Sequence, residues 1–269
     1  MNPTAYEQVA ALFEQELRAR GIFFSRNEDG TYHVEASPSF QPTVHLGNLT
    51  REWEKEPAAD MVHHFVRVVL ESGNLTDTAW DVAREGIYFC LFPKEDLEDP
   101  SWQALGPLRD DLSPGLAKLY AFDRREAGTT VWISGSNLAH WGVTADEIRA
   151  LAMQHMNEKM RQAEVDFIDV DTRRIAILGT EETNLKASLM LTEEFARRMK
   201  AEFTWPVYTL VPADDYMFIV PADDKDLLNR ATGAAMREYE RVDLPLSREI
   251  FKISDEGVRH FATIERKSG

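Results

Sequence analysis

The chain contains 269 residues, of which 43% are hydrophobic and 28% are charged, so it has the composition of a globular protein and is long enough to bury a core without metals or disulfides. Its 46 Asp and Glu residues outnumber 30 Lys and Arg residues, and the resulting charge of −16 disfavours nucleic acids and anionic membrane surfaces as partners. A basic protein or a cation is compatible with this charge.

The first 75 residues predict a small α+β lobe. Thr4 and Glu7 form a capping box, and apolar residues then recur at helical spacing until Gly21 ends the helix. The further expected elements are strands at 22–24 and 32–34, a short apolar piece at 44–46 and a helix at 58–70.

The middle of the chain predicts strands on either side of an acidic loop, followed by a helix. A second capping box, formed by Thr144 and Glu147, begins this helix. In chain order the expected elements are a strand at 87–92, the acidic loop at 93–114, a hairpin of strands at 116–123 and 129–134, and a helix at 144–160.

The last third repeats the mixed pattern. Leu191, Phe195 and Met199 recur at a spacing of four residues, which indicates a helix. The other expected elements are strands at 167–170, 175–178, 207–211, 217–220 and 250–253, and a helix at 224–242.

Short strands joined by tight turns, with helices between the pairs, favour an α+β fold over a doubly wound sheet. We therefore expect mainly antiparallel sheets with helices packed on one face, in which helix–hairpin units recur loosely. The predicted domains are an N-terminal α+β lobe at 1–75 and a larger α+β region at 76–269. An alternative divides the larger region into lobes at 76–160 and 161–269.

Nothing in the sequence predicts export or membrane insertion. The N-terminus lacks a basic stretch followed by an apolar one, and the apolar run at 87–92 is far too short to span a bilayer. A cytoplasmic location without membrane or nucleic-acid partners is therefore expected, and the oligomeric state is left open.

The sequence carries no recognised catalytic signature. The phosphate loop GxxxxGK[ST], the dinucleotide motif GxGxxG, the nucleophile elbow GxSxG and the zinc motif HExxH are all missing. The single cysteine, Cys90, lies in an apolar run typical of a buried side chain. A non-enzymatic role without a cofactor is favoured, although enzymatic activity stays open.

Clustered aspartates provide the main argument for an enzyme. Asp169 and Asp171 would share one face of a strand, and Asp214 lies in a predicted hairpin turn. Carboxylates that converge on a cleft can hold Mg²⁺ or Mn²⁺. The alternative function is therefore a metal-assisted hydrolase or transferase, whereas the structural interpretation is that these acids form turns and caps.

A second alternative is a small-ligand pocket in the loop at 135–142, which joins a strand to a capped helix. Ser136, His140 and Trp141 are residues that such a pocket would use, and a helix N-terminus attracts anions. The same residues are equally typical of a tight connection with a buried tryptophan.

The favoured function is that of a binding protein with an acidic surface for a basic protein partner, as in toxin-neutralising immunity proteins. The motivation is the net charge and the lack of a catalytic signature. The residues expected to bind the partner are Glu95, Asp96, Glu98, Asp99 and Trp102. A second acidic stretch lies at 214–226.

Four segments of the C-terminal half resemble a family of uncharacterised bacterial proteins that includes YtpQ. They are 144–148, 185–191, 211–220 and 244–247 together with Ile250 and Phe251. This family often has Asp-Gly before its Ala-Ser pair, where the present chain has Thr183, Asn184, Leu185 and Lys186. The resemblance implies a soluble bacterial protein and no catalytic residues.

Overall fold

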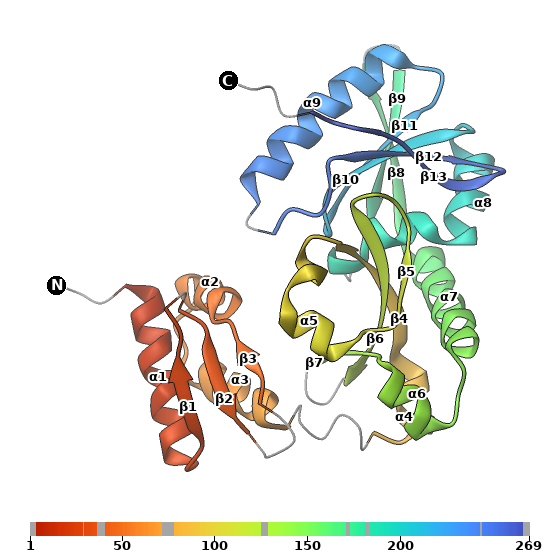
Figure 1. Ribbon diagram of the computed structural model, residues 1–269. Coiled ribbons are helices and arrows are strands. Elements are labelled where there is room, and N and C mark those ends of the chain that lie inside the picture. The colour runs from red at the N-terminus through yellow and green to blue at the C-terminus, as the bar shows by residue number, and fades with distance from the viewer. Residues whose placement is uncertain are drawn as a thin grey trace. The chain divides into compact units, whose positions relative to one another are not determined.

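The computed structural model describes residues 4–28, 30–36, 41–71, 78–124, 129–170, 173–180, 183–242 and 244–265 of an α+β chain (Figure 1). Every strand pair whose register is described is antiparallel, which confirms the predicted fold class. The chain divides into two compact units, one of Met1–Ala83 with Asp123–Val131 and one of Arg84–Phe122 with Trp132–Gly269.

The first unit packs helices against a three-stranded sheet of order β1-β2-β3. Thr4 accepts a hydrogen bond from the Glu7 backbone N–H at 3.3 Å and begins α1, as the capping box predicts. Its elements are α1 (Ala5–Ala19), β1 (Phe23–Arg26), β2 (Tyr32–Glu35), β3 (Thr43–Val44), α2 (Gly47–Lys55), α3 (Ala59–Glu71) and α4 (Trp80–Ala83). Buried side chains from α1, β2 and α3 form its core, among them Phe13, Leu17, Tyr32, Val34 and Val66.

The helix α2 is not foreseen by the sequence pattern. Its N-cap, Leu46, makes no side-chain capping hydrogen bond, and Gly47, a poor helix former, begins it. Leu46 itself is only 2% exposed. The burial of Leu46 explains the apolar piece predicted at 44–46, of which only Val44 belongs to a strand.

The second unit contains two sheets, and the smaller has the order β4-β6-β5 with β7 paired to β6. The strands of this sheet are β4 (Ile87–Pro93), β5 (Arg109–Asp111), β6 (Leu116–Arg124) and β7 (Thr129–Trp132), and the short helix η2 (Arg84–Gly86) precedes β4. The end of β6 and most of β7 fall within Asp123–Val131, which belongs to the first unit. The long helix α7 (Ala145–Gln162) packs along β4, and His155 Nδ1 hydrogen-bonds the Ile87 carbonyl oxygen at 2.7 Å.

The larger sheet has the order β13-β12-β10-β11-β9-β8. Its strands are β8 (Glu164–Val170), β9 (Arg173–Gly179), β10 (Val207–Ala213), β11 (Tyr216–Pro221), β12 (Glu249–Ser254) and β13 (Gly257–Thr263). The central strand β10 is buried along its whole length, whereas the edge strand β8 is largely exposed. The edge strand β13 is not foreseen, because only Val258 and Ala262 of its residues are even half-buried, so the apolar alternation is weak.

Helices cover both faces of this sheet, so the expectation of helices on one face is too simple here (Figure 1). On one face α9 (Lys225–Arg241) packs Leu227, Ala231 and Ala235 against β10 and β11. On the other face lie the 3-10 helices η4 (Thr183–Leu185) and η5 (Ala187–Leu191) and the helix α8 (Glu193–Glu202), and Thr209 of β10 donates a hydrogen bond to Met190 Sδ at 3.2 Å.

Two segments predicted as loops contain regular structure. The acidic loop at 93–114 contains η3 (Asp96–Glu98), α5 (Pro100–Leu105) and β5. The loop at 135–142 is the helix α6 (Gly135–Trp141), which Gly142 ends in the left-handed conformation at φ 67°. Asn137 Oδ1 accepts a hydrogen bond from the Ser134 N–H at 2.9 Å, so asparagine here takes the place that glutamate has in the usual capping box.

Candidate functional site

Four acidic residues lie on the short connection between β4 and α5. This acidic segment consists of Glu95, Asp96, Glu98 and Asp99, all of which are exposed. Leu97, in the middle of the segment, is 5% exposed and packs with Ala117 and Leu119 of β6. Because Leu97 fixes the connection to the sheet, the segment presents its carboxylates from an ordered support.

Trp102 of α5 belongs to an aromatic cluster beside the acidic segment. Its ring centroid lies 4.6 Å from that of Phe92 and 5.3 Å from that of Trp132. Trp102 is half-buried and does not project freely as an anchor for a partner. Trp102 packs against the same cluster as Leu97 and exposes only part of its side chain to solvent.

A cavity of about 530 Å³ opens next to this cluster, and we call it the Trp102 cavity. Glu98 and Trp102 both contribute to its wall, together with Lys94, Leu97, Gln103, Gly106, Pro107, Arg109 and Asp111. Lys94 Nζ lies 3.1 Å from Asp111 Oδ2, so the charge of this lysine is balanced within the wall. The cavity therefore places one carboxylate of the acidic segment next to an aromatic ring.

The carboxylates of the acidic segment are poorly neutralised by the chain itself. In the part of the chain that the structure describes, no Lys, Arg or His forms an ion pair with Glu95, Asp96 or Glu98. The pKa of Asp96 is raised, first by burial of its carboxyl group and then by the negative charge of Glu95. Like charges without internal partners favour an external cation.

Many other acids of the second unit have an arginine partner. Asp110 pairs with Arg149 at 2.7 Å and Asp169 pairs with Arg174 at 2.8 Å. Further acids that pair with arginine are Asp146, Glu158, Glu194, Glu202, Asp224, Asp226, Glu238 and Glu256. Sequence composition alone does not separate these paired acids from the unpaired ones.

The predicted ligand pocket of Ser136, His140 and Trp141 is not supported by their positions on α6. Ser136 Oγ lies 2.7 Å from Ser134 Oγ, and the exposed His140 lies on the same short helix. Trp141 packs edge-on against Phe122 with centroids 5.5 Å apart. None of the three residues lines the Trp102 cavity.

The aspartates predicted to bind a metal do not converge, which corrects that prediction for Asp169 and Asp214. Asp169 pairs with the second residue of β9, and Ile219 near the end of β11 pairs with Ala176 of β9. Asp214 lies before the start of β11, at the opposite end of these strands. Asp171 lies outside the described residues.

The surroundings of these aspartates also differ from those of a metal site. Arg174 lowers the pKa of Asp169 by hydrogen bonding to its carboxylate. The pKa of Asp214 is raised, mainly by desolvation and then by Asp215. Among the described residues, no group of three or more His, Cys, Asp or Glu side chains is placed to hold a metal ion.

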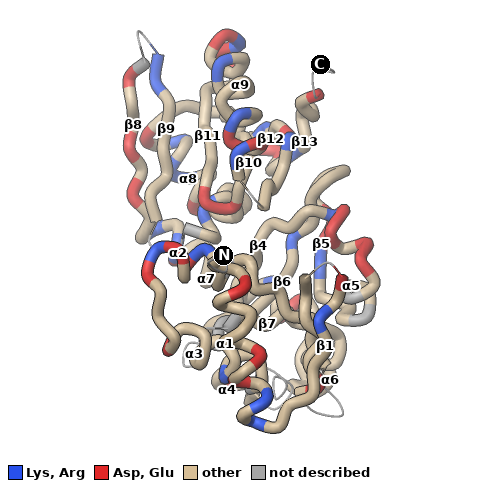
Figure 2. Tube along the Cα trace, turned by 90° about the vertical axis from the view of Figure 1, so that its left-hand side faces the viewer, with Lys and Arg blue, Asp and Glu red and all other residues tan. Residues whose placement is uncertain are grey.

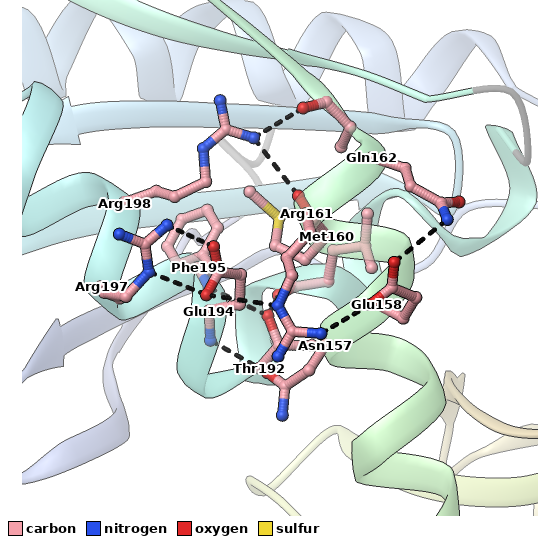
Figure 3. Close-up of polar contacts among 12 residues, drawn as sticks. Asn157, Glu158, Met160, Arg161, Gln162, Thr192, Glu194, Phe195, Arg197 and Arg198 are labelled. Carbon is pink, nitrogen blue, oxygen red and sulfur yellow. Dashed lines mark hydrogen bonds and ion pairs between the residues drawn. The ribbon is translucent and has the colours of Figure 1, made fainter.

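An arginine-rich contact between α7 and α8 was not foreseen from the sequence (Figure 3). Arg198 donates hydrogen bonds to the carbonyl oxygens of Met160 and Ala163 at 3.3 and 2.6 Å, and thereby satisfies the last turn of α7. Asn157 in turn accepts from the Glu194 N–H at 2.9 Å, at the start of α8. These side chains satisfy one another, so the cluster joins the two helices and offers no open site.

Comparison with known proteins leaves the family open. No family model, curated protein or solved structure matches the chain. The resemblance to the YtpQ family therefore stays a prediction. Within the described residues, no helix combines the length and apolar character needed to cross a membrane.

Proposed function

We propose that this chain is a non-enzymatic binding protein whose acidic segment docks a basic protein. The observation that carries the proposal is that Glu95, Asp96 and Glu98 have no ion pair with a cation of the described chain, whereas many other acids of the unit do. One partner of this kind is a basic toxin, which the chain would neutralise in the way that an immunity protein does.

The support beneath the segment favours binding. Leu97 is buried, and Trp102 packs against both Phe92 and Trp132 in the same cluster. A segment that is already ordered loses less conformational entropy when a partner binds, so more of the electrostatic attraction appears as affinity.

The Trp102 cavity is suited to a cationic side chain. A lysine or arginine of the partner that enters it would meet the ring of Trp102 and the carboxylate of Glu98. A cation over a tryptophan face is stabilised by about 0.5–2 kcal/mol, depending on how far it is desolvated. The neighbouring carboxylates would add long-range attraction and make association faster at low salt.

The test compares three immobilised forms of the full chain in capturing proteins from the native host. The site variant is Glu95→Gln, Asp96→Asn, Glu98→Gln and Asp99→Asn. The matched control neutralises four other exposed acids, Glu193→Gln, Asp215→Asn, Asp223→Asn and Glu240→Gln, so both variants lose the same charge. A basic protein that the wild type and the control retain and the site variant loses supports the proposal.

The captured protein is then titrated against each form at two salt concentrations. We expect the site variant to bind about tenfold or more weakly, and the affinity of the wild type to fall as salt rises. Equal weakening in the site variant and the control would mean that net charge alone attracts the partner, and this would overturn the assignment to the acidic segment.

A further inference from the structure

A second cavity, of about 270 Å³, lies between α9 and the strands β9 and β11, remote in sequence from the acidic segment. We call it the α9 cavity. Its walls are strongly apolar and include Ile175, Ile177, Phe218, Leu227, Ala231 and Ala234.

The cavity exists because α9 does not cover the whole sheet. Leu227, Ala231 and Ala235 pack against β10 and β11, and the small side chains of Ala231 and Ala234 leave space towards β9. Ile177 of β9 is consequently 41% exposed, and Tyr216 at the start of β11 is 40% exposed. Large apolar side chains left open next to an apolar cavity are typical of a binding site.

The charged residues of the lining are both cations. Lys186, just before η5, and Arg230 of α9 line the cavity, in a chain whose net charge is −16. Across the described residues, no carboxylate forms an ion pair with Lys186. An apolar cavity with cations in its wall is complementary to a molecule that is apolar over most of its length and anionic at one end.

We propose that the α9 cavity binds a small amphipathic carboxylate, such as a free medium-chain fatty acid, with its chain against Ile177 and Phe218 and its carboxylate towards Lys186. The volume of about 270 Å³ favours a small molecule over a protein segment, because it lies just below the roughly 300–1,000 Å³ of small-molecule pockets. This inference is independent of the acidic segment.

In the experiment, the full chain is titrated with decanoate, 1-decanol or decylammonium below their aggregation limits, and binding is measured by calorimetry. We expect decanoate to bind saturably and better than the alcohol or the amine. Lys186→Met should weaken decanoate about tenfold, the loss of one charge-assisted contact, and leave decanol unchanged. Lys225→Met, which removes an exposed cation at the start of α9 that does not line the cavity, is the matched control and should leave decanoate binding unchanged.

A second variant tests whether the hydrocarbon chain of the ligand lies in the α9 cavity. Ala234→Phe should fill the cavity and abolish the binding of both decanoate and decanol, with circular dichroism confirming that the chain is folded. Binding that persists in Ala234→Phe, equal binding of the amine, or no saturable binding of decanoate would each overturn the proposal.

Two further measurements distinguish a free fatty acid from a membrane lipid and from a second copy of the chain. Anionic vesicles of phosphatidylglycerol should not sediment the chain if the ligand is a free acid, and sedimentation that Lys186→Met abolishes would assign the site to a membrane lipid instead. A dimer in light scattering that Ile177→Asp converts to a monomer would overturn the proposal in favour of a second copy of the chain.

Discussion

The carboxylate of Asp110 accepts hydrogen bonds from Nε and Nη2 of Arg149 at 3.0 and 2.7 Å. The Tyr120 hydroxyl donates to the same carboxylate at 2.6 Å. The pair joins β5 to α7 across 39 residues of sequence. Asp110 lies in the predicted acidic loop at 93–114, but its carboxylate is used within the fold.

Asp110→Asn should lower the free energy of unfolding by about 2 kcal/mol. The substitution removes the negative charge that pairs with Arg149, and the Arg149 guanidinium and the Tyr120 hydroxyl then lack a charged acceptor. Asp146 provides the control, since it pairs with the same arginine at 2.8 Å but its side chain is 91% exposed. Asp146→Asn should therefore cost about 0.5 kcal/mol or less in urea unfolding. Equal losses in the two variants would contradict the role given to Asp110.

The contribution of Asp110 should depend on pH. Burial acts to raise the pKa of Asp110, but the hydrogen bonds from Arg149 and Tyr120 outweigh it and hold the pKa below its usual value. The stabilisation is thus complete above the unfolded pKa of about 3.9 and is lost as the pH falls through the lower folded pKa. Urea unfolding of the wild type and Asp110→Asn from neutral to acid pH should show the difference between them shrinking on acidification.

Asp96→Asn should have the opposite effect on stability. The raised pKa of Asp96 means that the folded chain disfavours its charged form. Above the raised folded pKa the charge is therefore slightly destabilising, and this effect disappears as the pH falls below the unfolded pKa. We expect a gain of about 0.5 kcal/mol or less near neutral pH, because the residue is exposed. A marked loss of stability on urea unfolding would show that Asp96 has a structural role instead.

Glu249→Leu should destabilise the contact between the two sheets of the second unit. Glu249 is 4% exposed and accepts hydrogen bonds from Ser113 Oγ at 2.5 Å and from the Gly115 N–H at 3.1 Å. We expect a loss of about 2 kcal/mol in chemical unfolding, since both donors lose their acceptor. Glu249→Gln keeps the shape and one acceptor oxygen and should lose less; identical losses would contradict the hydrogen-bonding role.

Arg198→Met should weaken the junction of α7 and α8 shown in Figure 3. The change leaves the carbonyl oxygens of Met160 and Ala163 without their donor, which we expect to lower the free energy of unfolding by about 1.5 kcal/mol. Arg241→Met removes an equally charged but 74% exposed side chain and should change the free energy of unfolding much less. Thermal unfolding of the two variants provides the comparison.

Local patterns predicted most of the elements, because the signals that begin them lie within a few residues. Thr4 and Thr144 cap α1 and α7 as their capping boxes predict. The helix α6 was missed because its capping box uses Asn137, a residue equally common in loops.

The candidate sites depend on contacts that no local pattern contains. Which acids have their charge balanced by an arginine is decided by pairs such as Asp110 and Arg149, far apart in sequence. The separation of Asp169 and Asp214 follows from β9 lying next to β11 in the sheet. The α9 cavity likewise depends on how far one helix reaches across a sheet.

The position of β8 at the end of the larger sheet has a consequence for solubility. An open edge strand can pair with a strand of another molecule and begin aggregation. Along this edge the chain places Glu164, Asp166 and Asp169, all exposed, and acidic residues are visible along β8 in Figure 2. A second copy of β8 would bring like charges together, so these carboxylates protect the edge from growth into a continuous intermolecular sheet.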